Sequence, residues 1–296
     1  MFGSGPSDLA ERLERIERKL DALEYHSHGA RAVSLGDNRV LAKAVVAGRN
    51  IAYLLEADDR LITPWLLITG DYETELTNWL VRELKPDSRC IDIGANFGRF
   101  TCLMARFTAD GQVVGVEADE RIWTLARDNT LINGFNHASV IHAAISDGDA
   151  PVTLYRRNTR SGNTSIIAAD TLLTDLLGEA PAESFSVRGI TVDEVVAGMG
   201  GRVDFMKIDV EGSEPLAFRG MTRTLADNPQ LVIMMEWSPG QIKSAGFDVS
   251  VFLDELTGMG FDFFDMRGSE LAPLTKDDLL AIPYLFAIAL KRRHGL

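Results

Sequence analysis

Several features are scarce in this 296-residue sequence, and each scarcity limits what the protein can do. There are two cysteines, Cys90 and Cys102, both inside apolar segments. A redox pair is therefore not expected, and the two thiols are interpreted as small buried side chains in a reducing compartment. His26 and His28 lie close together, but no second pair of metal-binding side chains accompanies them, so no metal site is predicted there.

Positive charge is also in short supply. Lys and Arg number 30 against 43 Asp and Glu, which gives a formal net charge of −13. Because duplex nucleic acid is bound through a basic surface, a nucleic acid substrate is not expected. The longest late apolar run, from Ile282 to Leu290, is too short to cross a bilayer. The first residues are polar and charged, unlike a signal peptide, so a cytoplasmic protein is predicted.

The chain is organised around residues 89–119, RCIDIGANFGRFTCLMARFTADGQVVGVEAD. Residues 90–93 form a short apolar run, typical of a parallel strand buried on both faces. The turn at 94–98 has a glycine at each end, which lets the backbone bend sharply and lets a ligand approach it. A helix predicted from 97 to 107 would direct its free N–H groups at that ligand. Glu117 ends a second strand, at about the 20-residue spacing that suits hydrogen bonds to ribose hydroxyls.

The same turn distinguishes between cofactors. A dinucleotide site needs a second glycine where Asn96 stands, and Asp92 would repel a pyrophosphate. S-adenosylmethionine has no phosphate and carries a sulfonium and an ammonium, so an aspartate beside the turn suits it. The pattern D-x-G-x-N-x-G followed by a strand-end acid resembles motifs I and II of class I methyltransferases. A doubly wound protein with a merely tight glycine turn is the alternative.

A second informative stretch is residues 204–214, DFMKIDVEGSE. Residues 205–208 predict a strand that places Asp209 on the rim where Gly94 and Glu117 lie, and Glu211 follows in the loop. Residues 231–235 predict the next strand, which Glu236 ends. With a third strand at 139–143 and two last strands at 261–266 and 284–290, the pattern predicts an α/β fold. It is a seven-stranded, doubly wound, Rossmann-like sheet of the class I methyltransferase type, whose seventh strand is antiparallel.

Two extensions precede the predicted methyltransferase domain, which spans residues 71–296. Within the first of them, 1–29, the segment 8–25 carries apolar residues at heptad spacing, namely Leu9, Leu13, Ile16, Leu20 and Leu23. This seam favours an N-terminal coiled-coil helix that assembles a homo-oligomer, and a helix docked on its own domain is the alternative. The second extension, 30–70, predicts a small β cap with strands at 38–46 and 50–56.

Four segments together resemble the FkbM family of S-adenosylmethionine-dependent methyltransferases. They are GDYE at 70–73, IDIGANFG at 91–98, SGNTS at 161–165 and KIDVEGSE at 207–214, of which the last is the most specific. The strand-end Glu236 also fits the family. The resemblance implies O-methylation of a hydroxyl on a sugar, a glycan or a polyketide-type small molecule.

These observations assign a site. Asp209, Glu211 and Glu236 are the predicted catalytic residues, because clustered carboxylates raise one another's pKa and one of them can then act as a base. Asp209 is the favoured base. Glu211 could instead brace its loop, and the three acids could instead hold a divalent cation. The predicted contacts to S-adenosylmethionine are Glu73, Asp92, Gly94, Ala95, Asn96, Phe97, Gly98, Glu117, Ala118, Ala144 and Asp209.

Two alternatives stay open. The segment 151–165 contains Arg156, Arg157 and Arg160 and predicts either a solvated hairpin or a flap that meets a polar acceptor. A non-catalytic scaffold or sensor that binds S-adenosylmethionine or S-adenosylhomocysteine and assembles through residues 8–25 is the rival to an enzyme. The acids at the ends of the predicted strands favour the enzyme.

Overall fold

The structure, a computed structural model, describes residues 31–60, 62–70, 73–156, 164–167, 182–267 and 270–292. The predicted heptad seam at 8–25 lies outside the described residues, as do Arg157 and Arg160. No helix in the described part of the chain is long and apolar enough to span a membrane.

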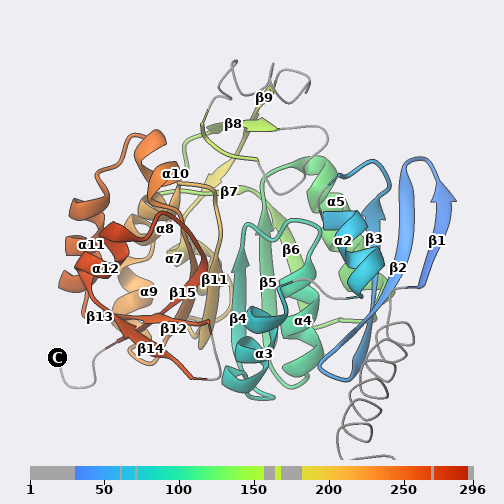
Figure 1. The fold of residues 1–296 in the computed structure, drawn as a ribbon, viewed down its shortest axis with the longest axis horizontal. Coiled ribbons are helices and arrows are strands. Elements are labelled where there is room, and N and C mark those ends of the chain that lie inside the picture. The colour runs from blue at the N-terminus through green and yellow to red at the C-terminus, as the bar shows by residue number, and fades with distance from the viewer. Residues whose placement is uncertain are drawn as a thin grey trace, which may run out of the picture.

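The centre of the fold is one mostly parallel sheet of eight strands, in the order β14-β13-β15-β12-β11-β4-β5-β6 (Figure 1). Its strands are β4 (Arg89–Ile93), β5 (Gln112–Glu117), β6 (Ala138–His142), β11 (Phe205–Ile208), β12 (Val232–Trp237), β13 (Phe261–Asp265), β14 (Ala272–Leu274) and β15 (Leu285–Arg292). The five strands from β12 to β6 are parallel, and β15 runs antiparallel between β12 and β13. The predicted α/β architecture is therefore present, with an antiparallel last strand.

The predicted count of seven strands is wrong by one. The additional strand is β14, which pairs antiparallel with β13 and forms one edge of the sheet. Three residues, one of them Pro273, give no readable alternation in the sequence. A proline is tolerated there because an edge strand leaves one side of its backbone unpaired.

Helices cover both faces of this sheet. They are α3 (Thr74–Glu83), α4 (Arg99–Phe107), α5 (Glu120–Ile132), α7 (Val192–Gly198), α8 (Glu214–Arg219), α9 (Thr222–Asp227), α10 (Pro239–Ser244), α11 (Val249–Gly258) and α12 (Lys276–Ala281). Two of these helices, α8 and α9, follow each other closely along the chain. Gly220 separates them, and a side chain at this position would collide with the carbonyl oxygen of Ser146.

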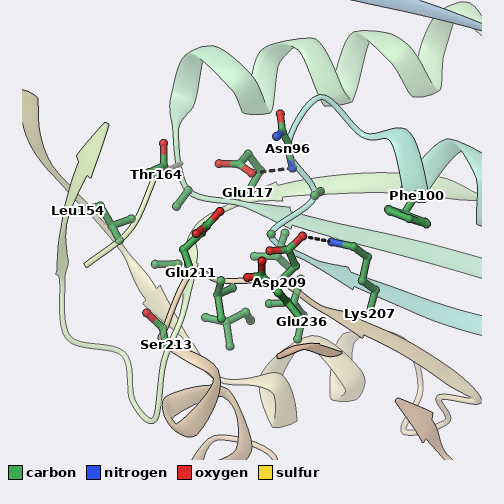
Figure 2. Close-up of a pocket in the computed structure, with 18 of the residues that line it drawn as sticks. Asn96, Phe100, Glu117, Leu154, Thr164, Lys207, Asp209, Glu211, Ser213 and Glu236 are labelled. Atoms are coloured by element: carbon green, nitrogen blue, oxygen red, sulfur yellow. Dashed lines mark hydrogen bonds and ion pairs between the residues drawn. The ribbon is translucent and has the colours of Figure 1, made fainter. Parts of the chain in front are cut away.

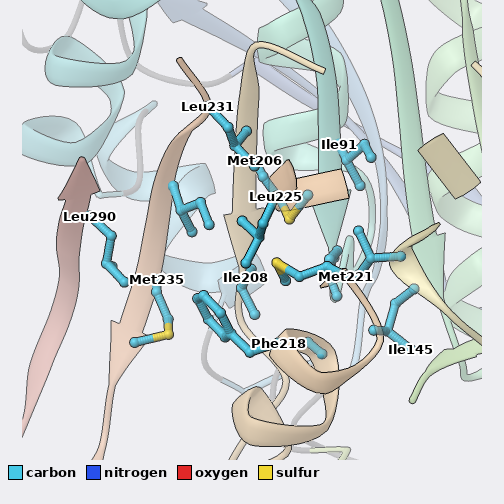
Figure 3. Packing of buried hydrophobic residues seen from close by; sticks show 14 of the residues in the cluster. Ile91, Ile145, Met206, Ile208, Phe218, Met221, Leu225, Leu231, Met235 and Leu290 are labelled. Carbon is cyan, nitrogen blue, oxygen red and sulfur yellow. The ribbon is translucent and has the colours of Figure 1, made fainter. Parts of the chain in front are cut away.

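The alternation of side chains along the strands produces two cores. Ile91 and Ile93 of β4 point to one face, while Cys90, which precedes Ile91, points to the other. Figure 3 shows the first core, in which Met206 and Ile208 of β11 pack against Phe218 of α8. A strand buried on both faces carries apolar residues continuously, which is the pattern that the sequence showed.

A smaller antiparallel sheet, β1 (Arg31–Gly36), β2 (Arg39–Val46) and β3 (Arg49–Glu56), lies beside the main one (Figure 1). The helix α2 (Ile62–Thr69), which the sequence did not predict, follows it. Ala42 of β2 and Tyr53 of β3 share a core with Leu103 of α4. Two further small sheets pair β7 (Ala144–Ile145) with β10 (Gly189–Ile190), and β8 (Val152–Arg156) with β9 (Glu183–Val187).

Candidate active site

A cavity of about 460 Å³ opens at the carboxyl ends of β4, β5, β11 and β12 (Figure 2). This edge is where ligands bind in open α/β sheets. The volume is within the usual range for a small-molecule site. Eleven of the predicted site residues line it, namely Glu73, Gly94, Ala95, Asn96, Phe97, Glu117, Ala118, Ala144, Asp209, Glu211 and Glu236. Two predicted residues, Asp92 and Gly98, are not among the lining residues.

The two turn glycines have different structural roles. Both adopt a left-handed backbone, with φ of 73° at Gly94 and 83° at Gly98. A Cβ at Gly94 would lie 1.8 Å from the backbone oxygen of Asp209, so only glycine lets β4 and β11 meet at the cavity. A Cβ at Gly98 would lie 3.0 Å from the Cα of Ala126. Gly98 therefore serves the packing of α4 on α5.

Glu117 is fixed at the cavity wall by backbone donors. Its two carboxylate oxygens accept the N–H groups of Asn96 and Asp119, each at 2.8 Å. Burial raises the pKa of Glu117 to about 7, although these hydrogen bonds oppose the shift. Each carboxylate oxygen has a second lone pair, so the group can still accept hydrogen bonds from a ligand.

Asp92 lies behind the cavity wall. Its side chain is fully buried, accepts a hydrogen bond from the Thr101 hydroxyl at 2.6 Å, and lies 3.9 Å from the ammonium of Lys207. Burial raises the pKa of this carboxyl, and Lys207 opposes the rise. The structure therefore brings Asp92 to Lys207 and not to the cavity.

Lys207 is a site residue whose role the sequence did not reveal. Its ammonium lies 2.9 Å from Asp209, while its side chain, 6% exposed, lines the cavity. The same nitrogen sits 5.1 Å from the centre of the Phe100 ring, a cation–π contact. Burial disfavours the charge, but the carboxylates of Asp209 and Asp92 more than offset it, so the pKa of Lys207 is raised.

Asp209, Glu211 and Glu236 converge as predicted from their strand ends. Carboxylate oxygens of all three lie within 4.8 Å of one another. Burial, followed by the neighbouring carboxylates, raises the pKa of both Glu211 and Glu236 strongly. One oxygen of Glu236, Oε2, is buried and has no hydrogen-bond partner in the described part of the chain.

Two residues from distant segments hold these acids. Gln241 donates its side-chain amide to Glu211, whose backbone is left-handed with φ of 53°. Non-glycine residues rarely adopt that conformation, and such strain is concentrated at functional sites. Tyr284 shares a hydrogen bond with Glu236, and burial together with Glu236 raises the pKa of this phenol. Tyr284 is therefore protonated and donates to the carboxylate.

The FkbM methyltransferase domain matches residues 92–263, more than half of the chain. The chain belongs to the FkbM methyltransferase family. This confirms the resemblance seen in the sequence and the enzyme class, an S-adenosylmethionine-dependent methyltransferase.

Solved structures similar to this FkbM methyltransferase have low overall agreement with it. A precorrin-6y C5,15-methyltransferase from Geobacter metallireducens GS-15 is 11% identical with a TM-score of 0.40, covering 75% of this chain and 88% of that one. An O-methyltransferase from Bacillus cereus in complex with SAH is 14% identical with a TM-score of 0.40, covering 75% and 83%. A 16S rRNA N2 G1207 methyltransferase from T. thermophilus, in complex with AdoMet and guanosine, is 14% identical with a TM-score of 0.45, covering 88% and 52%. A search of curated proteins gave no match.

The cavity of this FkbM methyltransferase extends beyond the matched domain. Glu73, which is left-handed with φ of 54°, lies 3.8 Å from the guanidinium of Arg99, and burial raises the pKa of its carboxyl. Trp65 of α2 and Tyr284 also line it from outside the matched residues. No motif marked Arg99, Trp65 or Tyr284 in the sequence, because they come from three separate segments.

Arg156, the last residue of β8, is the one arginine of the basic segment that lies within the described residues. Arg156 lies 3.5 Å from Asp119 and 4.7 Å from the centre of the Phe185 ring. These contacts give Arg156 a structural role beside the cavity. The neighbouring Thr164 and Ile166 line the cavity wall.

Proposed function

We propose that this protein transfers a methyl group from S-adenosylmethionine to a hydroxyl of a sugar, a glycan or a polyketide-type small molecule. One observation carries the proposal. A single cavity holds both a carboxylate fixed by backbone donors, Glu117, and a cluster of three further carboxylates within 4.8 Å of one another. The first suits a ribose, and the second suits the removal of a proton from an acceptor.

The cofactor would lie along the rim of the sheet. Glu117 would accept hydrogen bonds from the ribose hydroxyls, and the apolar wall of Ala118, Ala144 and Leu154 would face the adenine. At the other end, Arg99 and Glu73 offer a cation and a carboxylate to the carboxylate and ammonium of the methionine moiety. In this arrangement Asp92 acts on the cofactor only through Lys207.

We assign the base to Glu236 in place of Asp209. The ammonium of Lys207 donates to Oδ2 of Asp209 at 2.9 Å, so one oxygen of this carboxylate is already occupied. Glu236 has a raised pKa, and its buried Oε2 has no partner in the described part of the chain. A base works best when its pKa lies near the working pH, and the positive sulfonium of bound S-adenosylmethionine would favour the ionised form of Glu236. Glu211, held by Gln241, would orient the acceptor.

The reaction is a displacement at carbon. The acceptor oxygen attacks the methyl carbon, the sulfur–carbon bond breaks, and the sulfonium becomes a neutral thioether. The acceptor proton passes to Glu236. Because the sulfonium is already a strong electrophile, the protein contributes alignment of oxygen, carbon and sulfur, together with this proton transfer.

We further propose that the acceptor is not a nucleic acid, that the protein works in the cytoplasm, and that residues 8–25 assemble a homo-oligomer. The net charge of −13 supports the first point, and the heptad seam supports the last. A cluster of three carboxylates could also bind a divalent cation, and this second arrangement would make transfer sensitive to a chelator.

The deciding experiment is calorimetry followed by turnover. S-adenosylmethionine should bind and NAD should not, and a panel of hydroxylated sugars and polyketide-type compounds should yield a methylated product by mass spectrometry. Tight binding of S-adenosylhomocysteine without turnover of any acceptor would favour the non-catalytic sensor. Absence of binding to either sulfur compound would refute the proposal.

A further inference from the structure

The small three-stranded sheet has two edges, and they differ in how their backbone groups are satisfied. At the inner edge, two side chains of α5 bond the main chain of β3. Asn133 bonds the N–H and the carbonyl of Ala52, at 2.9 and 2.7 Å. Asn129, one helical turn earlier, bonds those of Leu54, at 2.6 and 3.0 Å. The two amides take the place of a neighbouring strand, so this edge is closed.

The outer edge is formed by β1, and no other described strand pairs with it. Within the described residues β1 pairs with β2 alone, and it lies at the far side of the small sheet from the rest of the fold (Figure 1). Residues 32–36 are exposed, including Val33 at 59% and Leu35 at 52%. Natural edge strands are usually protected by a lysine, a proline or an inward charge. In β1 such features stand only at the two ends, namely the charge of Arg31 and a shift of register with β2 between Ser34 and Gly36. Residues 32–35 between them have no lysine, proline or charge.

The chain that precedes β1 indicates which partner covers this edge. The predicted heptad seam ends at residue 25, and residues 26–30 separate it from β1. Five extended residues reach about 17 Å at most. Two chains joined through the seam would therefore hold their β1 strands close together, at a high effective concentration.

We propose that β1 is a dimerisation strand that pairs antiparallel with β1 of a second copy of this chain. The pairing would join the two small sheets into one continuous sheet across a two-fold axis. Such an interface uses the same surface on both copies and closes on itself. Because Asn129 and Asn133 close the other edge, strand addition ends at the dimer and does not continue into a fibre.

Cysteine scanning of the full-length chain tests the geometry. A two-fold axis places one β1 residue opposite itself, with Cα atoms about 4.5–5.5 Å apart, which a disulfide can bridge. Single cysteines are introduced at Ala32, Val33, Ser34 and Leu35, and Ser244→Cys, exposed on α10, is the control. At least one β1 variant should form a covalent dimer on mild oxidation while the control does not. The native Cys90 and Cys102 are fully buried and do not interfere.

Sedimentation of matched double variants tests the energetics. Val33→Lys with Leu35→Lys places like charges across the proposed interface, and should raise the dimer dissociation constant by about tenfold or more. Leu131→Lys with Ile132→Lys changes two equally apolar exposed residues of α5, at 66% and 46% exposure, and should have no effect. A wild-type chain that is monomeric at all accessible concentrations overturns the proposal. So does a dimer in which no β1 cysteine cross-links above the Ser244→Cys control.

Discussion

Glu117 and Glu236 are the same residue type on the same rim of the same sheet, yet their surroundings differ. Glu117 ends β5, where two backbone N–H groups at 2.8 Å bind its two oxygens. Glu236 lies near the end of β12, within 4.8 Å of two other carboxylates, and one of its oxygens lacks a hydrogen-bond partner among the described residues. Burial raises the pKa of both, but Glu117 only to about 7, since backbone donors oppose the shift.

This difference indicates that position on the rim does not determine the chemistry of a strand-end acid. Backbone donors fix a carboxylate in one orientation and favour its charge, which suits a permanent hydrogen-bond acceptor. Neighbouring carboxylates disfavour the charge, which suits a group that takes up a proton during the reaction. The comparison therefore predicts separable effects on binding and on transfer.

The largest expected effect is on transfer. Glu236→Gln keeps the shape of the side chain and removes its basicity, so the single-turnover rate of methyl transfer should fall by about 10²–10⁴-fold. Affinity for S-adenosylmethionine, measured by calorimetry, should stay within a few-fold. Asp209→Asn is the comparison, and a larger loss in that variant would return the role of base to Asp209. Parallel losses of rate and cofactor affinity in Glu236→Gln would place this acid in the cofactor site.

Lys207 connects two carboxylates, that of Asp92 behind the cavity wall and that of Asp209 in the wall itself. Lys207→Met leaves the buried carboxylate of Asp92 and the half-buried carboxylate of Asp209 without their cation, and should lower the free energy of unfolding by about 3–5 kcal/mol. Lys207→Arg keeps the charge and should recover most of that stability. Chemical denaturation of the two variants provides the measurement. Equal stability of Lys207→Met and wild type would show that Asp92 is protonated in the folded protein.

The pKa of Glu214, a buried carboxyl close to Asp209, can be tested through the pH dependence of stability. It is 2% exposed, and burial raises its pKa from 4.5 to about 7. As pH rises, the unfolded chain loses the Glu214 proton at a lower pH than the folded protein does. The stability that this bound proton contributes therefore declines as pH rises from 4.5 through 7. Such a shift corresponds to roughly 3 kcal/mol. Glu214→Gln should leave stability near pH 4 unchanged and increase it by about that amount at pH 8.5; identical pH profiles would contradict the assignment.

The smallest expected effect is on cofactor binding. Glu117→Ala removes charge-assisted hydrogen bonds to the ribose, each worth about 1.5–3 kcal/mol, so affinity should fall about ten- to hundredfold. In the wild type, affinity should rise with pH through about 7, because the ionised carboxylate is the better acceptor. Glu120→Ala, exposed at the start of α5, is the control. Unchanged calorimetric affinity in Glu117→Ala would refute the ribose assignment.

Much of this fold was predictable because its strands are short, apolar and ended by acids. Such a pattern fixes the direction of each strand and the edge at which Glu117, Asp209 and Glu236 meet. The position of Asp92 was not predictable, because its side chain turns away from the cavity toward Thr101 and Lys207. A lysine two residues before Asp209 on a strand does point to the same face, so Lys207 could have been inferred.

Other parts of the site left no trace in the sequence. Tyr284 and Gln241 reach the acids from segments that no local pattern connects to them. The helix α2, which contributes Trp65 to the cavity, has apolar residues on every side, ITPWLLIT, and so no helical periodicity to detect. Contacts of this kind depend on tertiary packing, which a single chain does not encode in its local spacing.

The contact between Gly94 and the backbone of Asp209 sets a distance for the reaction. A missing side chain lets the neighbouring strands β4 and β11 stay at the ordinary spacing of about 4.8 Å. In the proposed arrangement β4 would lie beside the cofactor and β11 beside the acceptor. The distance between cofactor and acceptor would therefore be set by the backbone of the two strands, and would not vary with the surrounding side chains. Substitutions in α2 and in the segment at Tyr284 can then change which acceptors fit the cavity, while the distance over which the methyl group is transferred stays the same.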